Sequence, residues 1–298
     1  ELFFKKFEEK FPNVSEKKHE EIFLTSLKNK DFSEANSGPY TYSWGNIETK
    51  IKILSNYLNN IISKGDRCIL LSENRPEWLI SDIAIMNAGG VTVPLFTTYS
   101  KNDYEYIIKD CEPKVCIVSN IDQFKKIKNY IAENTIVISI DRFDETIEFF
   151  ENIFLKDKAI LKKSIESADP YNNELRRNDL ACIIYTSGTT GNPKGVMLSH
   201  GGILSNCEGA KKILKSLTKK DPPVFLTWLP LSHSYEHTVQ YDQLFLGAYI
   251  FYAESLEKLL SNMVVAKPTI MTAVPRFYQN LYSKISLNFR IIFFSLVR

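Results

Sequence analysis

The sequence predicts an α/β fold of the doubly wound type, with largely parallel sheets flanked by helices. Short apolar runs, typical of buried strands, alternate with longer segments whose apolar residues recur at helical spacing. One of these runs leads directly into a loop rich in glycine and hydroxyl groups, at residues 185–195. Open α/β sheets bind ligands where their strands end, so this loop is the first candidate site.

In the first half of the chain, an amphipathic helix is predicted over 47–62, where apolar residues mark one face. Pro76 suits the first turn of a second helix, which stops at Gly89 and Gly90. Ser100 with Asp103 resembles a capping box before a third helix. Between them we expect the buried strands 68–71, 91–94, 115–118 and 136–140.

The second half continues the alternation. We expect strands at 181–184, 224–229 and 249–252, with helices from Ser199 to about Leu217 and from Ser255 to about Val265. Residues 267–278 complete one more strand-to-helix unit. Residues 141–178 are charged and only weakly periodic, and we expect them to form irregular surface structure that leads to the loop 185–195.

Composition narrows the function classes. A net charge of +2 gives no reason to expect nucleic acid binding. Five cysteines without a CxxC pair are read as reduced residues of a cytosolic protein, and no apolar stretch is long enough to span a membrane.

Residues 1–40 are read as a helical lead-in. Four phenylalanines recur there at helical spacing among charges, at Phe3, Phe4, Phe7 and Phe11. A helix packed on its own domain is the favoured interpretation; the other is a helix that contacts a membrane surface, which would make a cytoplasmic protein peripheral at the membrane.

The loop 185–195 has the composition of a phosphate-binding loop. Glycines let the backbone turn sharply and approach a ligand, while hydroxyls, N–H groups and a lysine suit phosphate oxygens. A plain solvated turn needs neither four hydroxyls nor a lysine behind Pro193. The spacing differs from that of a Walker A motif. The candidate phosphate ligands are Thr186, Ser187, Gly188, Thr189, Thr190, Gly191 and Lys194.

A second chemical signal follows the strand at 224–229. The octet PLSHSYEH places polar and aromatic groups after that strand, and we single out His233, Tyr235 and His237 as candidate pocket residues. For His237 a structural role is an equal alternative. For Arg276, which follows Val274-Pro275, a salt bridge at a helix start is as reasonable as a substrate contact.

The stretch YTSGTTGNPKGV closely resembles the phosphate loop of the adenylate-forming enzymes, which include acyl-CoA synthetases, luciferases and peptide-synthetase adenylation domains. LPLSHSYEH and the KPT and VPR segments resemble the long-chain fatty acid–CoA ligase branch. The resemblance covers about residues 40–286.

That resemblance implies a two-step reaction. A fatty acid carboxylate attacks ATP to give an acyl-adenylate, and coenzyme A then displaces AMP. It implies ATP, Mg²⁺ and coenzyme A, with Thr186 as the hydroxyl on Mg²⁺, Lys194 as a charge at the phosphates, and His233 bordering the acyl pocket. The expected partners are these small molecules, and the oligomeric state stays open.

The resemblance also implies an incomplete enzyme. We divide the chain into the lead-in 1–40, an incomplete AMP-binding domain 41–286, and a tail 287–298 that departs from the family pattern. The family's adenine, ribose, second Mg²⁺ and C-terminal lysine groups are expected outside this chain, so we predict that it is inactive alone. Two alternatives remain: another adenylate-forming ligase, for a short-chain or amino acid, and a non-catalytic nucleotide-binding fragment.

Overall fold

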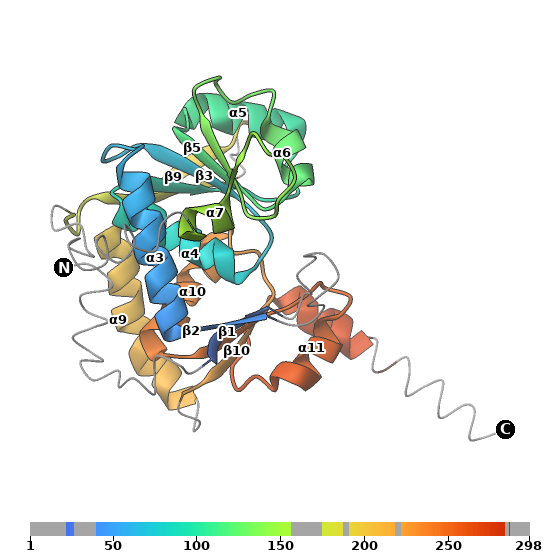
Figure 1. Cartoon of the computed structure of the whole chain (residues 1–298). Helices are drawn as coiled ribbons and strands as arrows, with labels where there is room; N and C mark the ends of the chain where they lie inside the picture. The colour runs from blue at the N-terminus through green and yellow to red at the C-terminus, as the bar shows by residue number, and fades with distance from the viewer. Residues whose placement is uncertain are drawn as a thin grey trace.

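The computed structural model describes residues 22–26, 40–155, 175–186, 191–217, 222–283 and 286. In these residues strands alternate with helices, and the strands form two sheets (Figure 1). Among the strand pairs described, only β1–β2 and β8–β9 are antiparallel. The predicted α/β class with largely parallel sheets is therefore confirmed.

The larger sheet has seven strands, in the order β7-β6-β5-β3-β4-β8-β9. Its strands are β3 (Arg67–Leu71), β4 (Val91–Pro94), β5 (Val115–Val118), β6 (Ile136–Ser139), β7 (Glu148–Phe149), β8 (Leu180–Thr186) and β9 (Lys194–Ser199). The four predicted strands 68–71, 91–94, 115–118 and 136–140 lie together in its middle, and they are parallel.

The smaller sheet has four strands, in the order β10-β11-β1-β2. They are β1 (Ile22–Ser26), β2 (Tyr40–Ser43), β10 (Val224–Thr227) and β11 (Tyr249–Tyr252). Strand β1 pairs in parallel with β11, through Leu24 and Ile250, so the sheet joins segments from opposite ends of the chain.

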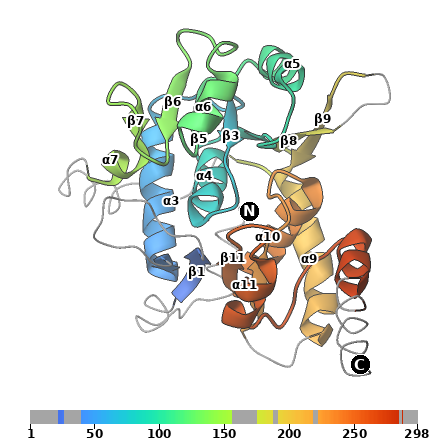
Figure 2. The ribbon, with the colours of Figure 1, turned by 90° about the vertical axis from the view of Figure 1, so that its right-hand side faces the viewer.

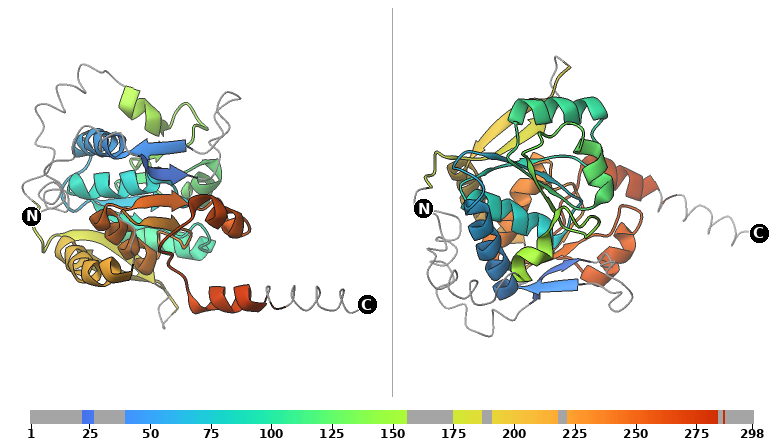
Figure 3. Two further views of the ribbon diagram at one scale, coloured as in Figure 1. Left: turned by 90° about the horizontal axis from the view of Figure 1, so that it is seen from below. Right: turned by 45° about the horizontal axis from the view of Figure 1, so that its top comes forward.

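Helices separate and cover the two sheets (Figures 1 and 3). Helices α3, α4 and α10 contribute to the core between the sheets, α5 covers the other face of the larger sheet, and α11 covers the outer face of the smaller one. The helices are α3 (Trp44–Asn59), α4 (Pro76–Asn87), α5 (Lys101–Cys111), α6 (Ile121–Ile127), α7 (Phe150–Leu155), α9 (His200–Leu217), α10 (Ser234–Leu246) and α11 (Leu259–Ala266). Residues 275–283 are also helical.

Local chemistry explains where several helices begin and end. Ser43 and Ser100 each cap a helix with a reciprocal capping box, which satisfies backbone N–H groups that have no partner within the helix. Pro76 occupies the first turn of α4, where a missing N–H costs nothing. Gly247 ends α10 in the left-handed conformation that a glycine adopts easily.

Three predictions need correction. Residues 22–26, in the expected helical lead-in, form strand β1, because their apolar run fills the position between β11 and β2. Residues 148–155, expected as irregular cover, form β7 and α7. The strand expected from 267 is reduced to a single bridge between Ile270 and Phe225. The helix expected around Phe3 to Phe11 lies outside the described residues.

Candidate functional site

The β8–β9 hairpin brings the two ends of the predicted phosphate loop together. Thr186, the last residue of β8, lies opposite Lys194, the first residue of β9, and both side chains are exposed. Figure 2 shows the hairpin projecting from the edge of the seven-stranded sheet. A hydroxyl and an ammonium group thus stand side by side at one end of the sheet. Residues 187–190, with the other predicted hydroxyls, lie outside the described residues.

Two glycines shape this hairpin. Gly191 has a φ of 99°, which an L side chain rarely adopts, so the turn there requires glycine. Gly195 lies opposite Tyr185, and a Cβ atom on it would be 2.8 Å from Ile183 Cγ2. The aromatic ring of Tyr185 therefore packs over backbone that has no side chain of its own.

Tyr185 fixes the base of the hairpin to the sheet. Its hydroxyl donates a hydrogen bond to Asp110 Oδ2 at 2.5 Å, and its carbonyl oxygen accepts one from the Tyr99 hydroxyl at 2.9 Å. Burial and the bond to Asp110 raise the pKa of Tyr185, so this phenol stays a neutral donor. Its role is to hold Thr186 in place.

On the other side of the site, the first turn of α10 carries the second signal. His233 is the N-cap of α10, and its Nδ1 accepts the N–H of Tyr235 at 3.2 Å, so this ring nitrogen carries no proton there. His233 and Tyr235 are exposed, whereas Glu236 and His237 are buried. His233 and Tyr235 thus face outward, whereas the next two side chains, Glu236 and His237, face inward.

Aromatic contacts connect the two sides. The ring of His233 lies 6.1 Å from that of Phe96, and the ring of Phe96 lies 5.1 Å from that of Tyr99, both edge to face. Tyr99 in turn bonds the carbonyl of Tyr185. His233 and Thr186 therefore lie at the same end of the molecule, with Phe96 and Tyr99 between them.

Asn74 ties the ends of two strands in different sheets together. Its Nδ2 donates to the Leu229 carbonyl at 2.6 Å, and its Oδ1 accepts from the Leu231 N–H at 3.0 Å. Asn74 follows β3 of the larger sheet, and Leu229 follows β10 of the smaller one. One amide side chain thus places the turn that leads to His233.

His237 points into the interface between α10 and α4. Its Nε2 lies 2.8 Å from Asp82 Oδ2 and 3.3 Å from the Tyr241 hydroxyl, which itself donates to Asp82. The Trp78 ring packs edge to face on the imidazole, at 5.2 Å. This is the structural role weighed from the sequence, and the pocket role of His237 stays a prediction.

Glu236 is fully buried beside these residues. Its Oε2 accepts a hydrogen bond from Thr272 Oγ1 at 2.8 Å, while Oε1 has no hydrogen-bond partner in the described part of the chain. Burial raises the pKa of Glu236 to about 7, and the nearby hydroxyls of Thr272 and Thr227 only partly offset this. The raised pKa favours the neutral acid at this position more than in an exposed glutamate.

Residues 271–274, which precede the helix 275–283, pack beside the first turn of α10. Trp228 Nε1 donates to the Thr272 carbonyl at 2.7 Å, and the Trp228 ring packs on Phe277 at 5.0 Å. Arg276 is exposed, and no ion pair is found for it among the described residues.

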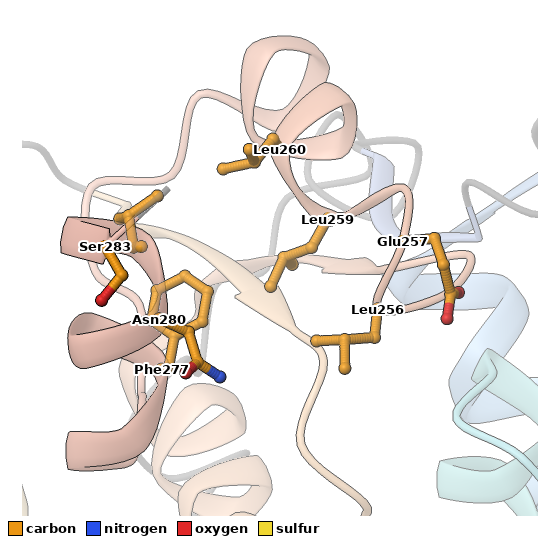
Figure 4. A pocket seen from close by; sticks show the side chains of 8 residues that line it. Leu256, Glu257, Leu259, Leu260, Phe277, Asn280 and Ser283 are labelled. Carbon is orange, nitrogen blue, oxygen red and sulfur yellow. The ribbon is translucent and has the colours of Figure 1, made fainter. Parts of the chain in front are cut away.

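An apolar cavity of about 320 Å³ lies between α11 and the helix 275–283 (Figure 4). It contains none of the predicted site residues. Its lining residues are Leu256, Glu257, Leu259, Leu260, Phe277, Asn280, Leu281 and Ser283.

The groups at the hairpin suit a nucleotide phosphate better than a metal ion held by protein alone. Lys194 and Thr186 offer charge and hydroxyl at an exposed strand end, and a phosphate chain could reach both. In the described ranges, no group of three or more His, Cys, Asp or Glu residues could hold a metal ion. A magnesium ion there would need phosphate oxygens and water for most of its ligands, as magnesium often does.

Sequence reasoning missed the residues that position this site. Asn74, Phe96 and Tyr99 follow β3 and β4, and their position after a strand of the parallel sheet is the signal that could have found them. Glu236 was quoted within the octet, but nothing in the sequence shows that it turns inward. Thr272 gave no signal.

The five cysteines are buried and free of disulfides, as predicted. Within the residues described, no helix combines the length and the apolar character that crossing a bilayer demands.

Solved structures share the fold. The ATP-bound MatB of Rhodopseudomonas palustris matches with a TM-score of 0.65 at 24% identity, over 92% of this chain and 50% of its own. A protein described as a putative long-chain-fatty-acid CoA ligase from the same organism matches with a TM-score of 0.71 at 17% identity, over 94% of this chain and 64% of its own.

Curated relatives are more similar in sequence. Fatty acyl-CoA synthetase A of Dictyostelium discoideum is 32% identical over 75% of this chain and 34% of its own length. Long chain acyl-CoA synthetase 3 of Arabidopsis thaliana is 30% identical over 86% of this chain and 40% of its own length. The chain thus spans between a third and two fifths of these relatives.

The family profile described as "AMP-binding enzyme" matches residues 15–291, nearly the whole chain. The strands that flank the predicted phosphate loop, β8 and β9, form a hairpin at the edge of a mostly parallel sheet, in the fold that the solved structures share. The chain belongs to the AMP-binding enzyme family.

Proposed function

We propose that this chain carries the phosphate-binding side and part of the acyl-binding side of an ATP-dependent fatty acid–CoA ligase. One observation carries the proposal. The Thr186–Lys194 pair on the hairpin is joined, through Tyr99 and Phe96, to His233 at the first turn of α10. Such an arrangement would allow a carboxylate and a triphosphate to bind close together. The curated relatives named as acyl-CoA synthetases support the same class of substrate.

In the proposed reaction, a fatty acid carboxylate displaces pyrophosphate from ATP, and the thiol of coenzyme A then displaces AMP. Both reactants of the first step are anions, so positive charge and hydrogen-bond donors must offset their repulsion. Lys194 would supply charge at the β- and γ-phosphates, and Thr186 would supply a hydroxyl. A bound Mg²⁺, with Thr186 as its protein ligand, would neutralise further phosphate charge.

On the acyl side, His233 and Tyr235 would face the carboxylate end of the fatty acid. His233 Nδ1 is occupied by the Tyr235 N–H, so only Nε2 is free to donate to a carboxylate oxygen. A carboxylate is already a nucleophile at neutral pH, and no general base is required.

The test is equilibrium binding of Mg·ATP and of palmitate to the 298-residue chain. Lys194→Ala should weaken Mg·ATP binding at least tenfold, the loss of about one charge-assisted contact, and leave palmitate binding unchanged. Lys212→Ala, which removes an exposed lysine from α9, is the matched control and should change neither. Equal ATP affinity in wild type and Lys194→Ala would refute the role of the hairpin.

The other readings make different predictions. A non-catalytic nucleotide-binding protein would bind Mg·ATP and not palmitate. A ligase for a short-chain or amino acid would bind those acids in preference. We still expect no acyl-CoA from this chain alone, and acyl-CoA formation above the level of Lys194→Ala would show that expectation to be wrong.

A further inference from the structure

Glu236 is the buried carboxyl group closest in sequence to the exposed residues His233 and Tyr235. It has no exposed surface, yet Oε1 has no hydrogen-bond partner among the residues that the structure describes. Leaving a buried carboxylate oxygen without a donor is costly, so its presence here calls for a role.

The contacts of Glu236 lead to one segment. Oε2 accepts the Thr272 hydroxyl, and the backbone carbonyl of the same Thr272 accepts the Trp228 indole N–H. Thr272 is thus held twice, by its side chain to α10 and by its backbone to the end of β10. Residues 271–274 belong to no strand in the described structure, so these two bonds, together with the packing of Met271 on the core around Leu226, attach the segment to the site.

Tyr235 and Tyr278 stand on the two sides of this attachment. Tyr235 is next to Glu236 on α10, and Tyr278 lies on the helix that begins just after residue 274. Both side chains are about half exposed. Burial raises the pKa of Tyr235, and the charges of Glu236 and Tyr278 add to the effect.

We propose that Glu236 is a positioning residue for the acyl side of the site: by bonding Thr272 it locks residues 271–274 to the first turn of α10 and sets the spacing of Tyr235 and Tyr278. The inference rests on the proposed function. Glu236 does not touch the substrate in this proposal; it acts through Thr272.

The neutral acid is the form suited to this task. The hydroxyls of Thr272 and Thr227 favour the charged carboxylate, but burial outweighs them and raises the pKa of Glu236. A neutral group also avoids placing a buried negative charge close to an incoming fatty acid carboxylate. In the described structure, the titratable groups that interact with Glu236 are the phenols of Tyr235 and Tyr252, both neutral near pH 7.

The first test is binding of palmitate and of Mg·ATP to variants of the 298-residue chain. Glu236→Ala and Thr272→Val, which each break the bond, should weaken palmitate binding at least fivefold and leave Mg·ATP binding within twofold. Glu236→Gln and Thr272→Ser keep a hydrogen bond and should stay within twofold for both ligands. Asp242→Asn is the matched control, because Asp242 is a second buried carboxyl of α10 that interacts with Cys207 of α9 instead.

The second test observes the Thr272 segment directly. In protein labelled with 5-fluorotryptophan, the Trp228 resonance, assigned with Trp228→Phe, should shift with pH around a midpoint near 7. Glu236→Gln should abolish that shift, and the Trp44 and Trp78 resonances should not share it. A Trp228 resonance that titrates equally in Glu236→Gln would overturn the inference.

The outcomes of the binding test separate the two proposals. If wild type binds both ligands and Glu236→Ala binds palmitate as well as wild type does, the positioning role is refuted and the function stands. If Glu236→Ala weakens both ligands equally, or Asp242→Asn weakens palmitate as much, the role is merely structural and the inference fails. If wild type binds neither ligand, the proposed function fails and the inference fails with it.

Discussion

The β8–β9 hairpin carries Thr186 and Lys194 on exposed strand ends at the edge of a sheet, whereas the first turn of α10 mixes exposed and fully buried polar residues. On the hairpin, the groups that would meet a ligand are separate from those that hold the backbone, such as Tyr185. On α10 the two kinds are adjacent within five residues, with His233 and Tyr235 exposed and Glu236 and His237 buried. Substitutions of Thr186 or Lys194 should therefore change binding with little effect on stability, whereas substitutions of the buried residues of α10 should lower the stability of the protein.

The largest expected effect lies on α10, at His237. His237→Ala removes a buried partner of Asp82 and should lower the free energy of unfolding by about 3–5 kcal/mol. Urea denaturation of His237→Ala and of the wild type measures this difference. His233→Ala, in the same octet but exposed, should cost only about 1 kcal/mol, the value of an N-cap. Equal costs at the two histidines would contradict the division into inward and outward residues.

The next effect is a pH dependence from Glu236. Its pKa in the folded protein is about 7, above the ordinary value near 4.5, so the folded state holds the proton more tightly. The contribution of Glu236 to stability is then greatest below about pH 4.5 and falls as the pH rises to about 7, by roughly 3 kcal/mol at most.

Urea midpoints between pH 5 and 8 check this. Glu236→Gln should remove the loss between pH 6 and 7, and Asp242→Asn, whose carboxyl has a pKa raised to about 6, should remove a loss at lower pH. Stability that rises with pH in this window because of Glu236 would show that the acid is ionised in the folded protein.

A smaller effect is expected at Gly195 of the hairpin. Gly195→Ala places a Cβ 2.8 Å from Ile183 Cγ2 and near the Tyr185 ring, which should cost about 1–3 kcal/mol in free energy of unfolding. Gly209→Ala on α9 is the opposite case, because no atom lies within 4 Å of the added Cβ. It should stabilise the chain by up to about 1 kcal/mol through helix propensity. Thermal denaturation distinguishes the two signs.

The smallest effect on stability is expected at Lys194. Lys194→Ala should leave the free energy of unfolding within about 0.5 kcal/mol, since the side chain is exposed, although it should weaken Mg·ATP binding tenfold. Fluorescence-detected urea denaturation measures the first quantity. A stability loss as large as that of His237→Ala would mean that Lys194, like His237, contributes to the stability of the fold, and would contradict the difference between the hairpin and α10.

Much of the fold follows from local patterns in the sequence. Capping boxes at Ser43 and Ser100, the proline that starts α4, and the apolar runs of the larger sheet were all readable, because each depends on residues adjacent in the chain. Strand β1 was not, since it becomes a strand only by pairing with β11 and β2. Tertiary pairing overrides local propensity there.

In the candidate site, too, local motifs could be predicted from the sequence and tertiary contacts could not. The phosphate loop and the octet are contiguous motifs, and the sequence places them at strand ends. The direction of each side chain in the octet depends on packing against α4 and on Thr272, thirty-odd positions away, so the inward turn of Glu236 and His237 could not be predicted. The bridge through Tyr99 and Phe96 depends on the adjacency of β4 and β8, which periodicity alone does not give.

The pairing of Leu24 with Ile250 has a consequence for synthesis on the ribosome. At about 5–20 residues per second, the partner of β1 emerges on the order of tens of seconds after β1 itself. During that interval an apolar strand with unpaired backbone groups is available to other nascent chains or to chaperones. The larger sheet, whose central strands β3, β4 and β5 arise in succession, can form meanwhile. Ribosome-bound chains stalled before residue 249 should therefore resist protease over 67–118 and be cleaved within 22–26.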